Sequence, residues 1–371
     1  MTKRVMNQNT VQPGLFGLAK SNRDFSQPNS WGKNQFNNSF PASLACYMHS
    51  KGLQLVYLTL DKNLKIKHIK IDVTEIFGIT PLSPNLFFAF ESDYLPYRKL
   101  VIGRLLRVDL VTLNTLSIDT CLRSIEIKLT ALPDNSTCRL PDHKYGCEIV
   151  TRPDTIVYLA LSIADKFQDS REQILKYLEP VCSEIIDWIS IPNMLPYISR
   201  LIESLDNLLY DHIEMQSPLV MQPVWKTVGK TSKLYQNCLD IFIWSDFGFT
   251  RLFFDVTKKL LIGAESIQRH ARTVIWLAKM LYEFATNGKI PHASIIDILT
   301  YHTKNDKAFA SSGLNTHPYM ICDELIKPRI MKEEIGNIIL GGGQTYLSPE
   351  RRFDGIILSN PEIFDEDLKY I

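Results

Sequence analysis

The sequence predicts a mixed α/β protein, with a mixed sheet flanked by helices and a large C-terminal extension. Apolar runs of strand length recur between residues 53 and 132. Longer segments with helical character follow at 155–167 and 172–188. Hydrophobic residues make up 45% of the 371 residues, so the chain can bury a sizeable core.

The elements are expected in the following order along the first half. A helix over 40–51 has Pro41 early and Gly52 just past its end. A second, short helix is expected over 71–77, and strands are expected at 53–58, 85–90, 100–113 and 121–132. Pro153 favours a helix start there, and the two helices at 155–167 and 172–188 complete a core near residues 50–170.

The second half is expected to be mixed. Strands are predicted at 239–244 and 252–256, on either side of a turn at 245–248. The longest helix is predicted over 264–286, ending at Asn287-Gly288, and a late strand at 355–358. Three regions follow: a polar arm with the first helix (1–50), the core (51–170), and a helical and mixed C-terminal region (171–371).

Charge and composition exclude several classes of protein. Lys and Arg number 41 against 40 Asp and Glu, which rules out a polybasic nucleic-acid tail but leaves room for a basic cleft. No apolar run approaches the 18 residues of a membrane span, and the polar N-terminus is unlike a secretory signal. The seven scattered cysteines indicate reduced thiols, so we expect a cytoplasmic protein without a membrane partner.

The chemistry-bearing pattern is Asp109, followed by Glu126 and Lys128. Along a strand Glu126 and Lys128 share one face, and a hairpin centred between residues 117 and 118 places Asp109 opposite Glu126. Two carboxylates can hold Mg²⁺, and the lysine can orient water or offset charge in phosphodiester hydrolysis. The alternative is an amphipathic hairpin with a surface Glu–Lys pair. The three-residue pattern is loose and can arise by chance, because Asp354 followed by Asp367-Leu368-Lys369 also fits it, in a charged tail.

This trio resembles the PD-(D/E)xK nuclease core. Longer stretches resemble the HindVP/HgiDI family of type II restriction endonucleases, among them Arg107-Val108-Asp109-Leu110-Val111-Thr112 and Ile125-Glu126-Ile127-Lys128-Leu129. The others lie at 15–24, 31–37, 130–134, 152–155, 222–226 and 244–247. Val108 stands where the core pattern has Pro, a departure that affects a turn rather than the chemistry.

The resemblance implies a PD-(D/E)xK restriction-endonuclease-like core and Mg²⁺-dependent cleavage of double-stranded DNA at a short palindrome, GRCGYC for this family. Asp109 and Glu126 would be metal ligands and Lys128 the catalytic lysine. A further carboxylate often joins such sites. Glu91 is assigned as that ligand and Glu75 remains the alternative, while a surface acid is the other role for either.

A palindromic site matches a two-fold homodimer, in which the C-terminal region would serve recognition and dimerisation. The candidate DNA-binding residues are Asn22, Arg23, Lys33, Asn34, Lys226, Lys230, Arg351 and Arg352. The alternative for each is that its side chain is solvated at the surface without contacting DNA. A companion DNA methyltransferase would belong to the same system without physical contact. Two rivals remain: a non-catalytic DNA-binding protein on the same fold, and a structure-specific repair nuclease.

Overall fold

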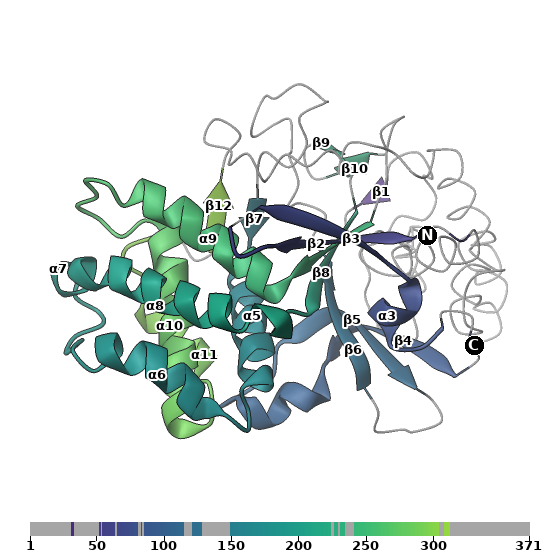
Figure 1. Ribbon diagram of the computed structural model, residues 1–371, viewed down its shortest axis with the longest axis horizontal. Coiled ribbons are helices and arrows are strands. Elements are labelled where there is room, and N and C mark those ends of the chain that lie inside the picture. Colours follow the sequence, from purple (N-terminus) through teal and green to yellow (C-terminus); the bar gives the residue numbers. More distant parts are fainter. Residues whose placement is uncertain are drawn as a thin grey trace, which may run out of the picture.

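The described part of the chain is built around one seven-stranded sheet (Figure 1). The structure is a computed structural model that describes residues 31–32, 52–114 apart from 53, 64, 81, 82 and 84, then 121–127, 149–223, 226–228, 231–233, 241–303 and 308–311. The sheet order is β3-β2-β11-β8-β6-β5-β4. Its strands are β2 (Leu55–Leu60), β3 (Ile66–Ile71), β4 (Leu86–Asp93), β5 (Arg107–Asn114), β6 (Cys121–Ile127), β8 (Pro218–Pro223) and β11 (Ile241–Ser245).

The sheet is mixed, as the sequence predicted. Strands β4, β5 and β6 form an antiparallel meander, whereas β6 pairs in parallel with β8, and β11 in parallel with β2. A parallel neighbour requires a long crossover, and the helical segment between β6 and β8 supplies it. The strand predicted over 100–113 begins later, at Arg107: η2 (Leu95–Leu100) is a 3₁₀ helix with Pro96 in its first turn, and the chain then bends at Gly103, whose φ is 94°.

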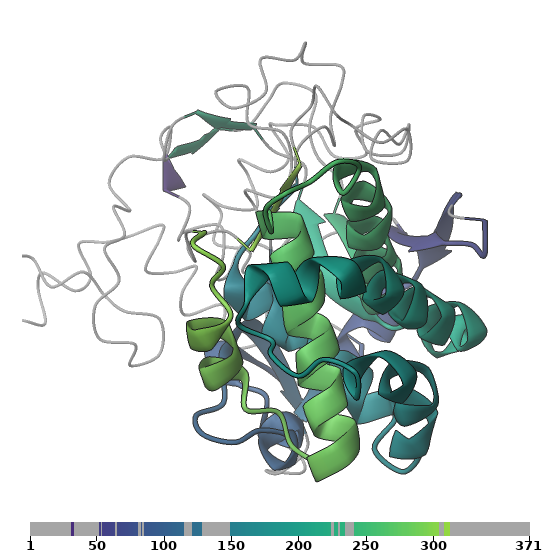
Figure 2. The same cartoon turned by 90° about the vertical axis from the view of Figure 1, so that its left-hand side faces the viewer.

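Helices pack against the sheet. Figures 1 and 2 show the longer helices gathered on one side of the molecule, and Figure 1 shows α3 (Val73–Phe77) beside β4 and β5. The longer helices are α5 (Pro153–Lys166), α6 (Arg171–Cys182), α8 (Ile198–Asp211), α9 (Asp246–Leu260) and α10 (Arg269–Asn287). Helix α5 is buried from Thr155 to Ala164 because it lies between the sheet and the outer helices, α10 among them.

Short elements complete the described fold. The helices are α7 (Ile191–Met194), η3 (Leu195–Tyr197), η4 (Ile213–Met215) and α11 (His292–Ile298). A three-stranded sheet contains β1 (Trp31–Gly32), β10 (Thr231–Lys233) and β9 (Lys226–Val228), and a two-stranded sheet pairs β7 (Ile149–Thr151) with β12 (Phe309–Ser311). Among the described helices none has the length and apolar character that crossing a bilayer requires.

The strand predicted at 252–256 and the turn at 245–248 are wrong, because α9 begins at Asp246, directly after its N-cap Ser245, and includes 252–256. The Ser245 side chain caps this helix by accepting a hydrogen bond from the Gly248 backbone N–H at 2.7 Å. A short apolar run does not distinguish a strand from a buried helix, and here the Ser245 cap stabilises the start of a helix.

Two predicted helix boundaries also shift. Helix α6 ends at Cys182 rather than near Trp188, with Pro180 already in its last turn, where proline removes a backbone donor. Helix α10 begins at Arg269, later than the predicted 264, and ends as predicted before Gly288, whose φ of 76° provides the left-handed cap. The predicted helix at 40–51 and strand at 355–358 lie outside the described residues.

Candidate active site

The three predicted carboxylate residues occupy one row across the meander. Strand pairing joins Leu110 to Ile125 and, on the other side, Phe90 to Leu110 and Ser92 to Val108. Extending each register by one residue places position 91 opposite position 109, and position 109 opposite position 126. Directly opposed positions lie about 5 Å apart, so three carboxyl-bearing residues stand on three neighbouring strands. The hairpin register expected from the sequence is the one observed at residues 110–112 and 123–125.

The strands that carry this row are held firmly. Val108, Leu110 and Val111 on β5 are at most 2% exposed, and Ile125 on β6 is also buried. The Thr112 hydroxyl, itself buried, donates to the Phe77 carbonyl at 3.0 Å and so ties β5 to α3. Strand β6 also has a neighbour on each side, because residue 126 pairs in parallel with Val220 of β8. Buried neighbours and strand pairing therefore hold the backbone of β5 and β6 in place at positions 109 and 126.

The structure distinguishes the two candidates for the further carboxylate. Glu91 lies in β4, in the row just described. Glu75 is an exposed residue in the first turn of α3 and lines a cavity next to β6.

Most of the other candidate residues lie outside the described part of the chain; these are Lys128, Asn22, Arg23, Lys33, Asn34, Lys230, Arg351 and Arg352. Lys226 begins β9 and pairs with Lys233 of β10. Strand β10 in turn pairs with Trp31 and Gly32, next in sequence to Lys33. The backbone therefore brings the N-terminal arm and the segment around Lys226 into one small sheet.

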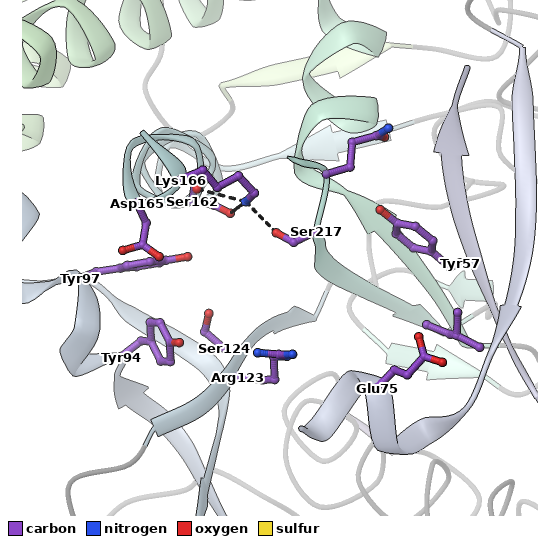
Figure 3. A pocket seen from close by; sticks show the side chains of 12 residues that line it. Tyr57, Glu75, Tyr94, Tyr97, Arg123, Ser124, Ser162, Asp165, Lys166 and Ser217 are labelled. Carbon is purple, nitrogen blue, oxygen red and sulfur yellow. Dashed lines mark hydrogen bonds between the residues drawn. The ribbon is translucent and has the colours of Figure 1, made fainter. Parts of the chain in front are cut away.

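A cavity of about 540 Å³ lies near the carboxylate row and is bordered by α3, α5, β2 and β6 (Figure 3). Its described lining is Tyr57, Ile71, Glu75, Tyr94, Tyr97, Arg123, Ser124, Ser162, Asp165, Lys166, Gln216 and Ser217. Ser124 pairs with Val111 and precedes Glu126 by two residues, so the two positions lie on one sheet face about 7 Å apart. The cavity thus adjoins the row.

The cavity is bordered by an ion pair between Lys166, at the end of α5, and Asp246, at the start of α9. The Lys166 ammonium lies 2.5 Å from Asp246 Oδ2 and also donates to the Ser217 hydroxyl at 2.7 Å. Asp246 is fully buried and accepts further hydrogen bonds from the Ser162 hydroxyl and the backbone N–H groups of Ser217 and Phe247. This network joins α5, the start of β8 and α9 at one point.

Burial alters the acid–base behaviour of the groups that line the cavity. It raises the pKa of Asp165 from its ordinary value, although Lys99 and Lys166 oppose the shift. It also raises the pKa of Tyr94, with Asp165 adding to the effect, and the pKa of Tyr97. Because these tyrosines stay neutral at physiological pH, they present hydroxyls and ring faces rather than charge.

Sequence reasoning missed Asp165, Lys166 and Asp246. One signal was present, since Ser162 and Lys166 follow a run from Ile156 to Leu161 that is apolar on all sides of the helix. A helix of that kind is buried, so its polar residues require partners. The partner, Asp246, was placed in a turn, which concealed the pair.

Known restriction enzymes are similar in sequence to this chain. Residues 31–364 match the HindVP restriction endonuclease family. Over 357 residues the chain is 49% identical to the type II restriction enzyme HgiDI of Herpetosiphon aurantiacus, covering 96% of this chain and 98% of that relative. It is 44% identical over 362 residues to the probable type II restriction enzyme HindVP of Haemophilus influenzae, covering 98% of both. No solved structure matches. The chain therefore belongs to the HindVP family of restriction endonucleases.

Proposed function

We propose that this protein is a type II restriction endonuclease that hydrolyses double-stranded DNA at a short palindromic site, GRCGYC, with Mg²⁺. The observation that carries the proposal is the strand register that aligns positions 91, 109 and 126. The names of the two relatives, both type II restriction enzymes, support the reaction class. The meander followed by a helical crossover to a parallel strand supports a PD-(D/E)xK-like core.

The donor set fits a hard divalent cation. Three carboxyl-bearing positions about 5 Å apart offer the oxygen ligands that Mg²⁺ prefers, with room for retained waters. Asp109, Glu126 and Glu91 are the residues that would hold it. When bound, Mg²⁺ supplies polarisation of a phosphoryl oxygen and activation of water.

The chain's own residues have distinct roles in this proposal. The buried neighbours of Asp109 fix where its strand lies, which limits the geometry in which a phosphate can approach. Lys128 follows Glu126 by two residues, so an extended backbone carries it on the same face. Its ammonium would orient the attacking water and offset negative charge that develops on the phosphoryl oxygens.

Recognition would require partners beyond the carboxylate row. The small sheet that joins Trp31–Gly32 to Lys226–Val228 supports a contribution of the arm and of Lys226 to DNA binding. Asn22, Arg23, Lys33, Asn34, Lys230, Arg351 and Arg352 remain the further candidates. A homodimer would place one active site on each DNA strand of a palindrome, and a companion methyltransferase in the cytoplasm would protect host DNA.

The first test is digestion of unmethylated phage DNA by the purified protein, with Mg²⁺ and then with EDTA. We expect discrete bands whose ends map to GRCGYC and which disappear with EDTA. Bands at another sequence would discard this specificity. A folded protein that binds DNA but never cuts it would favour the non-catalytic rival, and cleavage only at branched or damaged DNA would favour a repair nuclease.

The second test addresses the catalytic lysine. Lys128→Ala should abolish cleavage while leaving specific binding within a few-fold of wild type, because the lysine acts on the reacting water rather than on base edges. Glu203→Gln is a control, since Glu203 is exposed on α8. Filter binding and single-turnover cleavage separate the two quantities. Parallel loss of binding and cleavage would contradict the role given to Lys128.

A further inference from the structure

The cavity beside the carboxylate row has no role in the chemistry proposed above. It lies about 7 Å along β6 from position 126, so a DNA strand whose phosphate reaches the row passes near the cavity. Its volume of about 540 Å³ lies within the range of sites that hold small organic groups, roughly 300–1,000 Å³. Any occupant delivered by DNA would be a phosphate or a base.

The charges around the cavity disfavour a phosphate. Lys166 is already paired with the buried Asp246, so its charge is neutralised locally. Arg123 is then opposed by two lining carboxyl groups, Glu75 and Asp165. A phosphate would enter a site without excess positive charge, whereas a neutral group avoids that cost.

The aromatic lining favours a flat occupant. Figure 3 shows Tyr94 and Tyr57 on opposite sides of the cavity. Tyr94 is supported from behind, because its ring meets Tyr97 edge to face at 4.8 Å and Tyr97 meets Tyr158 at 5.6 Å. Both supporting rings are buried, so the exposed part of Tyr94 is held in place before any ligand arrives.

Polar groups between the aromatic rings can bind the edge of such a ligand. Ser124 contributes a hydroxyl, which both donates and accepts, whereas the Ser217 hydroxyl already donates to Asp246 Oδ2 at 3.1 Å and offers an acceptor lone pair. Asp165 contributes a carboxylate, whose oxygens accept hydrogen bonds from the ring and exocyclic N–H groups of a base. Ring faces together with donors and acceptors at the edge are what a nucleobase uses for stacking and pairing.

We propose that the cavity receives one nucleobase that has rotated out of the DNA duplex beside the cleavage position. A base inside the duplex cannot present its pairing edge to Asp165, so entry requires extrusion. This inference rests on the proposed nuclease function. It assigns Tyr94 to stacking and Asp165 to edge recognition.

A mismatch scan tests the proposal. Binding of the wild-type protein to target duplexes is measured by fluorescence anisotropy in EDTA and again with Ca²⁺, with one pair at a time converted to a mismatch by changing a single base. Extrusion costs less when the pair is already broken. At one position, a mismatch that preserves the extruded base should tighten binding about tenfold. Absence of any tightening at every position would overturn the proposal.

Matched variants identify the cavity as the receiving site. Tyr94→Leu should weaken binding to the intact target at least fivefold, because base–aromatic stacking is lost. Tyr210→Leu, at an exposed tyrosine of α8 outside the cavity lining, should bind as wild type. Circular dichroism confirms that each variant is folded. Wild-type binding by folded Tyr94→Leu would contradict the assignment, and discrete cleavage without mismatch tightening would refute the cavity proposal while sparing the nuclease proposal.

Discussion

Replacing Lys166 by methionine would leave the Asp246 carboxylate buried without its ammonium partner. Asp246 is fully buried and Lys166 is 16% exposed in its side chain, so water cannot readily replace the lost charge. Removing one partner of a buried pair costs about 3–5 kcal/mol. Asp246 keeps the Ser162 hydroxyl, the backbone N–H groups of Ser217 and Phe247, and the first turn of α9 as compensation. We therefore expect the free energy of unfolding to fall by about 3 kcal/mol, the lower end of that range.

Urea unfolding followed by circular dichroism measures this loss. Lys259→Met is the control, because its i,i+4 pair with Asp255 lies at the surface and should contribute about 0.5 kcal/mol at most. The double variant Lys166→Met/Asp246→Asn should be less destabilised than the sum of the two single variants by at least about 1 kcal/mol. A loss below about 1 kcal/mol for Lys166→Met, or strict additivity, would refute the reasoning.

Two further predictions concern the same region. Ser245→Ala removes the hydrogen bond that caps α9 at Gly248 and a 2.7 Å hydrogen bond to Gln216. The free energy of unfolding measured by urea titration should therefore fall by about 1–2 kcal/mol. An unchanged urea midpoint would contradict the stabilising role of this cap. Burial raises the folded-state pKa of Asp165, so wild-type stability is lost as pH rises from the ordinary carboxyl range through that pKa. Asp165→Asn should therefore be more stable than wild type at pH 7, with the difference narrowing as pH falls towards 4, and a difference that widens on acidification would contradict this sign.

The meander could be predicted from the sequence because its information is local. Side-chain alternation and the equal distances of Asp109 and Glu126 from a short turn define the register, and Leu110 does pair with Ile125 as that register requires. The sequence alone left Glu75 as an alternative to Glu91, because choosing firmly between them requires knowing that β4 pairs with β5. The catalytic and metal-binding roles of these residues stay predictions.

Long-range features could not be predicted in this way. Lys166 and Asp246 are 80 positions apart, and neither carries a local signal for the other. The boundary expected near residue 170 separates the two halves of the chain in sequence, yet β8 and β11 from the second half complete the sheet of the first. The error at 252–256 has a different origin, because its apolar run fits both a strand and the buried side of a helix.

The pairing of β2 with β11 has a consequence for when the enzyme becomes complete during synthesis. Val56 pairs with Phe242, so among the described strands the hairpin of β2 and β3 joins the sheet through β11, which the ribosome makes much later. Tyr57, one wall of the cavity, therefore reaches its place after α5 to α8 and β11 have emerged. A nascent chain with its carboxylate meander already formed would still lack this wall, which delays assembly of the full site until most of the protein has been translated.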